Sequence, residues 1–406
     1  MDAILPSIRI RDFLSLYAVI LLGFLGYALT ITMFIPMLMD EHFLLLPTTA
    51  STSLRATLSG GLLAMYPLGQ FFGSPIIGRL SDVYGRKKVL MLSLLACTIG
   101  FAGIALSIEF KHLGLLFASS FLTGLCESNM AISQSVISDR THNESLKNKL
   151  IGYGYSACSL GYIIGPLLAS VSLNYSLPFL ITSILVPFLM LWLWLDFDDQ
   201  YIINQSQKVE KLTLGNSLGA IKSIFSQKKL LKFYMINFAI FFSVQGLYRV
   251  IPLYIVDSWN PTLKTFSYLI AFVSSMCFFS NIFILGPLSN RYTTKKLLAG
   301  LLLIGGAIVI FVTVPAQFNW IWLTYGLAVI PTVMALPTCT TWLIQQVSKS
   351  EQGQVLGNNQ ALLVLGEATS AALGGAIAAI WIPLPVISLG VILLLTALAI
   401  SQIKEH

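Results

Sequence analysis

The chain has 406 residues, of which 56% are hydrophobic and only 10% are charged. A water-soluble domain is about 45–50% apolar and about 25% charged, so this chain lacks the polar residues needed to cover its surface in water. The composition therefore excludes an ordinary soluble protein and predicts an integral membrane protein. The formal net charge is +7, which would also suit a nucleic-acid-binding protein. The distribution of the charges along the chain distinguishes the two possibilities.

Apolar runs long enough to cross a bilayer, about 20 residues each, recur from one end of the chain to the other. Their hydrophobic residues do not alternate as barrel strands would, so the spans are expected to be helices. The first run lacks the short core and small-residue cleavage site of a signal peptide, which favours a retained helix. We therefore expect an all-α membrane protein with twelve transmembrane helices, at residues 14–38, 56–80, 88–108, 113–137, 151–173, 177–197, 232–257, 265–289, 295–315, 318–345, 354–381 and 384–403.

Lysine and arginine are divided unequally between the two sides of this predicted membrane. The links on the side of the two termini hold 20 of them, whereas the links on the other side hold 3, namely Arg55, Lys111 and Lys264. Because basic links are retained on the cytoplasmic side, both termini are expected in the cytoplasm, and the membrane is expected to be the inner membrane of a bacterium. The basic excess is thus a topology signal, and we expect no nucleic-acid partner.

The chain divides into two halves with internal similarity. Residues 198–231 are the longest polar stretch, so we expect an N-terminal six-helix bundle at 1–197, a cytoplasmic linker at 198–231 and a C-terminal six-helix bundle at 232–406. GRLSDVYGRKKVL is echoed by GPLSNRYTTKKLL 208 positions later, and a pair of glycines nine residues apart recurs after 205 positions. Two parallel halves predict a substrate path at their interface, with one half rocking against the other.

The segment GRLSDVYGRKKVL links the second and third predicted spans. Gly78 and Gly85 are expected to let the helix ends approach closely, and Asp82 can pair with Arg86. The segment resembles the signature G-x-L-a-D-r-x-G-r-k of the major facilitator superfamily, which also fits the length, the topology and the repeat. The resemblance implies that these four residues form a gating motif, which latches the two halves together on the cytoplasmic side in the outward-facing state. Asn290 replaces the acid in the second copy, so the latch is expected to depend on the first.

The fifth predicted span, with the sequence IGYGYSACSLGYIIGPLLAS, is similar to the antiporter motif of the drug:proton antiporters, the tetracycline exporters especially. Gly161, Gly165 and Pro166 match the motif. Small residues allow close helix packing and proline supplies a bend, so this helix is expected to pack against a helix of the other half. The chain departs from the family at Ser120, where members usually carry an arginine, and in its first span, which has no acidic residue.

Two glutamates lie near the middle of predicted spans. An ionisable side chain there costs about 2.5–3.5 kcal/mol even on insertion scales, which makes each one a candidate functional residue. Glu127 lies in the fourth span, on a stripe of small and polar residues that includes Gln134 and is expected to face a cavity. Glu367 lies in the eleventh span. We expect Glu127 and Glu367 to be the proton-coupling residues.

Arg249, in the seventh span, is the third charged residue inside a predicted span. It is expected to bind a carboxylate or phosphate of the substrate, together with the nearby polar side chains of Gln245, Tyr248, Gln134 and Gln360. The alternative is structural: Arg249 neutralises a glutamate and stabilises the interface between the halves. Both remain open at this point.

The leading functional prediction is a proton-coupled antiporter that exports a small amphipathic compound by alternating access. The alternative is proton-coupled uptake or export of a polar metabolite, such as an amino acid, an organic acid or a carboxylate siderophore. A membrane sensor is disfavoured by the short links, and an enzyme by the absence of a nucleotide loop or a nucleophile–base arrangement in the sequence. We expect a small-molecule substrate, a lipid surround, no cofactor, no metal and a monomer driven by the proton gradient.

Overall fold

The computed structural model describes residues 10–43, 45–141, 144–196, 223–348 and 351–403, and these residues fold into helices without a strand. The elements, in chain order, are η1 (Ile10–Phe13), α1 (Leu14–Met39), α2 (Thr52–Tyr84), α3 (Arg86–Glu109), α4 (Leu113–Cys126), α5 (Asn129–Arg140), α6 (Glu144–Ser170), α7 (Leu177–Asp196), α9 (Leu231–Trp259), α10 (Leu263–Phe279), η2 (Ser280–Ile284), α11 (Leu285–Arg291), α12 (Thr294–Phe311), α13 (Asn319–Ile344), α14 (Gln352–Ala378) and α15 (Leu384–Gln402).

The all-α membrane fold is confirmed. Ten helical segments in the described part of the chain are long and apolar enough to cross a membrane, with α4 and α5 forming one of them and α10 to α11 another. The other two long helices, α2 and α6, contain 33 and 27 residues but also serines, glycines and charged ends, which lower their apolarity. Twelve spans therefore remain the prediction, with α2 and α6 as the two that apolarity alone does not identify.

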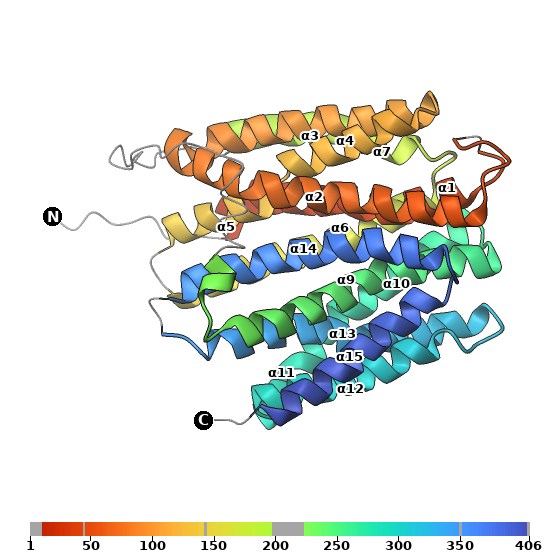
Figure 1. Cartoon of the computed structure of the whole chain (residues 1–406). Helices are drawn as coiled ribbons and strands as arrows, with labels where there is room; N and C mark the ends of the chain where they lie inside the picture. The colour runs from red at the N-terminus through yellow and green to blue at the C-terminus, as the bar shows by residue number, and fades with distance from the viewer. Residues whose placement is uncertain (1–9, 44, 142–143, 197–222, 349–350, 404–406) are drawn as a thin grey trace.

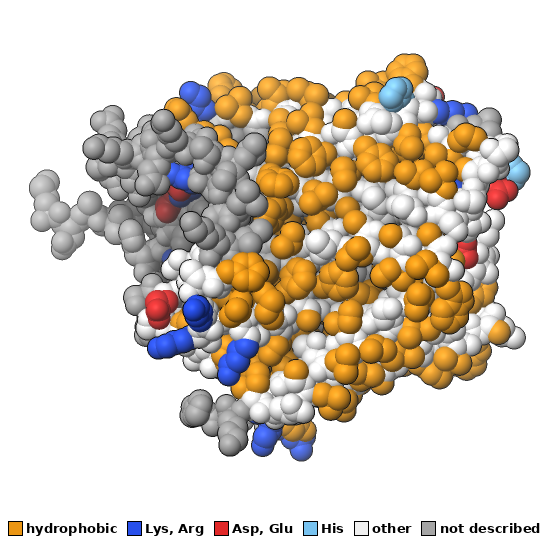
Figure 2. All heavy atoms as spheres, viewed as in Figure 1, with side chains coloured by type: hydrophobic (Ala, Val, Ile, Leu, Met, Phe, Trp, Pro, Cys, Tyr) orange, Lys and Arg blue, Asp and Glu red, His pale blue; other side chains and the backbone are white. Residues whose placement is uncertain are grey.

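Two groups of helices lie side by side, α1 to α7 and α9 to α15 (Figure 1). The start of α1 and the end of α15 lie at the same end of the molecule, which we call the terminal end; the opposite end, where α1 leads into α2, is the far end (Figure 1). Hydrophobic side chains cover the middle of the visible face and charged side chains gather toward its two ends, as a lipid-facing surface requires (Figure 2). Most of the predicted linker lies outside the described residues.

The two halves repeat the same contact at the start of corresponding helices. Lys87, at the start of α3, donates a hydrogen bond from Nζ to the carbonyl oxygen of Trp194 near the end of α7, at 2.9 Å. Lys295, 208 positions later at the start of α12, donates from Nζ to the carbonyl oxygen of Ile403 just after α15, at 2.5 Å. This equivalence supports the internal repeat that the sequence predicted.

Helix α6 contacts α10 of the other half, as expected, but its two motif glycines pack within their own half. A Cβ added at Gly161 would lie 2.5 Å from the carbonyl oxygen of Leu21, and one at Gly165 would lie 2.7 Å from that of Leu25, both on α1. Their small size brings two helices of one bundle together. Pro166 lies inside α6 next to this contact.

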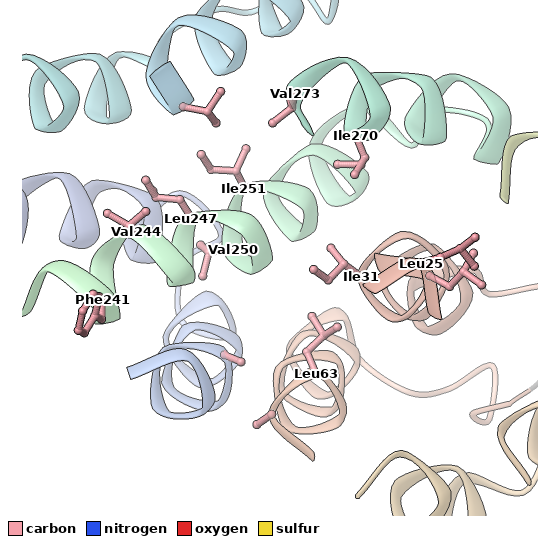
Figure 3. Close-up of a cluster of buried hydrophobic side chains, with 14 of the residues drawn as sticks. Leu25, Ile31, Leu63, Phe241, Val244, Leu247, Val250, Ile251, Ile270 and Val273 are labelled. Atoms are coloured by element: carbon pink, nitrogen blue, oxygen red, sulfur yellow. The ribbon is translucent and has the colours of Figure 1, made fainter. Parts of the chain in front are cut away.

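The two halves touch at the far end through α2 and α14. A Cβ added at Gly60 would lie 2.7 Å from the Cα of Gly375, and Ser53 donates a hydrogen bond from Oγ to the carbonyl oxygen of Ala379, at 2.8 Å. Apolar side chains from both halves form one buried cluster at this boundary, with Ile31 and Leu63 from the first half (Figure 3). These contacts close the boundary between the halves at the far end.

At the terminal end the same two helices are apart. Gly78 lies five helical turns from Gly60 and therefore on the same face of α2, yet no atom of the described residues lies within 4 Å of a Cβ added there. Gly353 and Gly357, on the corresponding face of α14, are equally open, and the axes of α2 and α14 diverge toward this end (Figure 1). Among the described residues, α2 and α14 thus pack together at the far end and stand apart at the terminal end.

Candidate functional site

A buried ion pair lies at the boundary between the two halves. Arg249 of α9 and Glu367 of α14 are 3% and 5% exposed, and Arg249 Nη2 lies 2.5 Å from Glu367 Oε1. Tyr27 of α1, in the other half, donates its hydroxyl hydrogen to Glu367 Oε1 and accepts a hydrogen bond from Arg249 Nη2. The structural alternative for Arg249 is therefore realised, with a phenol from the first half added to the pair.

Arg249 retains donor capacity that this network does not fill. Its Nε is buried without a hydrogen-bond partner, and Nη1 makes a single long contact, 3.5 Å, to the carbonyl oxygen of Gln245. A guanidinium group presents five N–H donors in a planar fork. An unpaired buried donor costs about 1–3 kcal/mol, so the site is not saturated by Glu367.

The pair borders a small cavity and a group of aromatic rings. Side chains from both halves line the cavity: Ile35, Ser59, Gly60, Leu63, Arg249, Val250, Leu253, Ala371 and Gly375. The ring of Tyr27 packs against Tyr66 with centroids 4.7 Å apart and against Tyr162 at 6.0 Å. The Tyr66 hydroxyl is buried and has no hydrogen-bond partner. The site therefore combines charge, aromatic surface and an unfilled hydrogen-bonding group.

The fourth span is broken at Glu127, so the expected continuous stripe from Ser120 to Gln134 does not exist. Helix α4 ends at Cys126, Glu127 adopts an extended conformation with φ −86° and ψ 110°, and α5 begins at Asn129. Serine and asparagine bond readily to nearby backbone and are poor residues for a helix interior. The break interrupts the helical periodicity that would place Gln134 on the same face as the residue one heptad earlier.

Glu127 points into the interior of the first half. It lines a cavity of about 10 Å³, close to the minimum volume for one water molecule, with residues of α1, α3 and α7 around it. A Cβ added at Gly23 would lie 2.5 Å from Glu127 Oε1 and 3.0 Å from Asn129 Nδ2, so glycine makes room for both side chains. Glu127 is 4% exposed and its Oε2 has no hydrogen-bond partner. Glu127 thus faces a cavity, as expected, but this cavity lies inside the first half.

The remaining predicted substrate-binding residues do not all converge on Arg249. Gln245 lies one turn before it on α9 and is half-buried, whereas Tyr248 lies within 3.2 Å, from its hydroxyl to the sulfur, of Cys277 on α10. Gln360 lies on α14, between Glu367 and the terminal end, and is exposed. Gln134 lies on α5 and is half-buried. The structure thus groups Arg249 with Glu367 and Gln245 and separates Tyr248 and Gln134 from them.

The gating motif forms a charge cluster at the terminal end of the first half. Arg86 pairs with Asp82 at 2.5 Å, as the sequence predicted. It also pairs with Asp139 of α5 at 3.2 Å and donates a hydrogen bond to Ser81 Oγ at 2.7 Å. These partners all belong to the first half, which fits a latch that is released while the terminal end is open.

The two glycines of the gating motif have different roles. Gly85 joins α2 to α3 with φ 93°, a conformation that side chains disfavour. No described residue approaches Gly78, so the prediction that it allows a close approach is wrong within the described part of the chain.

Two functional residues were missed by the sequence analysis. Tyr27 is one of several aromatic residues in an apolar helix, and its partners lie 222 and 340 positions away, so no local pattern marks it. Asp139 lies in a run of polar residues that includes Arg140, so the sequence does not indicate which basic residue pairs with Asp139. The one available signal for the helix break was the pair Ser128–Asn129, two successive residues with low helix propensity.

The structure contains two repeat-related groups of membrane-spanning helices, joined at one end, and a buried ion pair of the second group bonds to a phenol of the first. These features define a multi-pass membrane transporter rather than an enzyme. The Major Facilitator Superfamily model matches residues 16–335, and the chain belongs to that family.

Several characterised proteins resemble this chain along most of its length. It is 26% identical to the class C tetracycline resistance protein of Escherichia coli, over 76% of this chain and 77% of that protein. It is 25% identical to multidrug resistance protein 2 of Bacillus subtilis, over 89% of this chain and 88% of that protein. The fold is shared with the human organic anion transporter MFSD10, with TM-score 0.73 and 16% identity over 97% of this chain and all of that one. The resemblance to tetracycline exporters that the motifs indicated is thereby confirmed.

Proposed function

We propose that this protein is a secondary active transporter that works by alternating access and uses the proton gradient to export a small amphipathic compound. The terminal end is then the cytoplasmic side of a bacterial inner membrane, with both termini in the cytoplasm. The protein acts as a monomer and needs no cofactor.

The contact among Tyr27, Arg249 and Glu367 carries this proposal. It joins the two halves through an acid, so that a proton taken up by Glu367 weakens the bonds that hold the far end closed. Alternating access requires such a difference in stability between the two facing states. Glu127 supplies a second acid, which is buried in the first half and has a carboxylate oxygen without a hydrogen-bond partner among the described residues.

Export is supported by the names of the two relatives that match along most of the chain, a tetracycline resistance protein and a multidrug resistance protein. The open terminal end supports loading of substrate from the cytoplasm. Transport of a polar metabolite is the second candidate, and the unfilled donors of Arg249 favour it because they suit an acidic group.

Transport by purified protein in proteoliposomes with an imposed pH gradient tests the proposal. The substrates are tetracycline, a lipophilic cationic dye, glutamate and citrate. The double variant Glu127→Gln/Glu367→Gln serves as the control without titratable acids at the site. We expect accumulation of an amphipathic compound that follows the sign of the pH gradient and is lost in the double variant. Accumulation of glutamate or citrate alone would establish the second candidate, and transport that ignores the gradient would overturn the coupling.

A further inference from the structure

The boundary between the halves contains a site with the features of a carboxylate receptor. Arg249 is 3% exposed and engages Glu367 through Nη2 alone, which leaves Nε buried without a partner. Carboxylates commonly bind a guanidinium group through two parallel hydrogen bonds. Glu367 therefore uses only part of the donor fork, and a second carboxylate with freer geometry can use more of it.

The surroundings of Arg249 restrict the size and the character of the compound. The cavity beside it has a volume of about 10 Å³, enough for about one water molecule, so a bound head group must be small and must take up the space that the Glu367 carboxylate leaves. The rings of Tyr27, Tyr66 and Tyr162 provide an aromatic surface next to the charge. An apolar body attached to one acidic group matches both features.

We propose that Arg249 binds the carboxylate of the transported compound, that this compound is an amphipathic organic anion, and that its carboxylate takes the place of Glu367. This inference rests on the proposed function, because it names the substrate class of the same transporter. Displacement leaves Glu367 without its cation, so a proton on Glu367 favours binding of the anion. The ionisable groups around Glu367 are Arg249 on α9, Tyr27 on α1 and Tyr162 on α6, with Glu127 of the fourth span near enough to interact electrostatically.

The test compares ligands that share a body and differ in the head group. The probes are 4-phenylbutyrate, octanoate and salicylate, each beside its amide, with 4-phenylbutylamine and 4-phenylbutylphosphonate as charged alternatives. Binding to the full chain in detergent is measured by the ligand-induced shift in thermal unfolding between about pH 7.5 and about pH 5.5. We expect each carboxylate to bind at least about tenfold more tightly than its amide, a difference of about 1.4 kcal/mol.

Three variants separate the roles of the two charges. Glu367→Gln is expected to bind carboxylates more tightly than the native chain, because the amide competes less well for Arg249. Arg249→Gln is expected to lose the preference for carboxylates, but it also leaves Glu367 buried and unpaired, which endangers folding. Arg249→Gln/Glu367→Gln removes both charges together, should fold, and should bind carboxylate and amide equally.

Several outcomes would overturn the inference. These are equal binding of carboxylates and amides by the native chain, a preference for the amine or the phosphonate, or a carboxylate preference that survives in the double variant. Because binding in detergent needs no gradient, this result is independent of the transport assay. Gradient-driven transport without a carboxylate preference refutes the site alone, and a carboxylate preference without transport refutes the proposed function alone.

Discussion

Gly60 of α2 and Gly375 of α14 lie against each other across the boundary between the two halves. A Cβ at Gly60 would lie 2.5 Å from the carbonyl oxygen of Ala371 and 2.7 Å from the Cα of Gly375. Backbone atoms cannot move aside as a flexible side chain does, so closure of the far end depends on glycine at this position.

Gly60→Ala is therefore expected to open the far end. The measurement is the distance between spin labels at Lys111→Cys and Lys264→Cys, one in each half, in a chain whose native cysteines are replaced. We expect longer distances in Gly60→Ala. Gly61→Ala is the matched control, because its Cβ would meet only the ring of Phe117 at an ordinary 3.6 Å. Unchanged distances in Gly60→Ala, or equal changes in both variants, would contradict the assigned role.

Tyr27→Phe should shift the same equilibrium without a steric change. It removes one hydroxyl group that bonds to two charged residues, and such bonds contribute about 1.5–3 kcal/mol each. We expect a larger far-end-open population by the same spin labels, and faster loss of substrate toward the far side. Tyr17→Phe is the control on the same helix, since its hydroxyl bonds to the Leu150 carbonyl oxygen within the first half. If Tyr27→Phe and Tyr17→Phe show the same far-end-open population, the Tyr27 hydroxyl does not contribute to closure.

Asp82→Asn is expected to impair turnover while leaving insertion and stability nearly unchanged. The carboxylate is 43% exposed, and an exposed ion pair contributes about 0–1 kcal/mol, so the fold does not depend on it. Turnover depends on the relative stability of the two facing states, to which the motif contributes when the terminal end closes. The assay is transport per molecule of inserted protein. Normal turnover in Asp82→Asn would show that the charge of Asp82 does not affect transport and contributes at most to the membrane topology.

Glu127→Gln tests the proton carrier. We expect the loss of transport driven by a pH gradient, with substrate binding and gradient-free exchange largely retained, because the amide resembles the protonated acid. Glu127→Asp should keep some coupling with a shifted pH optimum. Glu109→Gln, at the far end of α3 where Glu109 accepts a hydrogen bond from Ser176, is the control. Uphill transport by Glu127→Gln would move the coupling role to Glu367, and loss of binding would make Glu127 a substrate ligand.

Labelling of introduced cysteines tests the orientation in the membrane. His42 is exposed at the far end and Ser226 is exposed at the terminal end. In intact cells, an impermeant thiol reagent should reach His42→Cys and fail to reach Ser226→Cys until the membrane is opened. The opposite pattern would reverse the assignment of the cytoplasmic side, and with it the direction of loading.

The features that sequence predicted well are those with a local physical cause. Long apolar runs fixed the spans to within a few residues, and Asp82 and Arg86 are close because four residues make one helical turn. The cluster around Arg249 was predicted only in part. Buried charge marked Arg249 and Glu367 as residues that need partners, but the phenol between them comes from a helix in the other half. Contacts between residues so far apart in the sequence depend on how the two halves pack together, and no local sequence pattern indicates that packing.

The surroundings of Glu127 escaped prediction for a different reason. Helical periodicity predicts a common face only along an unbroken helix. Because α4 ends at Cys126, the residues from Ser120 to Gln134 do not share one face. No proline or glycine marks the break. Competing side-chain hydrogen bonds from serine and asparagine are a weak signal, and only the fold decides whether they prevail over the helix.

The division of the site between the halves bears on the return step of the empty carrier. Both members of the ion pair, Arg249 and Glu367, belong to the second half, and the first half contributes an uncharged phenol. When the halves part, the pair can therefore move as one neutral unit, and only hydrogen bonds to Tyr27 need to break. No positive charge is pulled away from its counter-charge across the dividing plane, so the electrostatic barrier to reorientation stays low. An empty molecule arranged in this way resets without carrying net charge through the membrane field at this site.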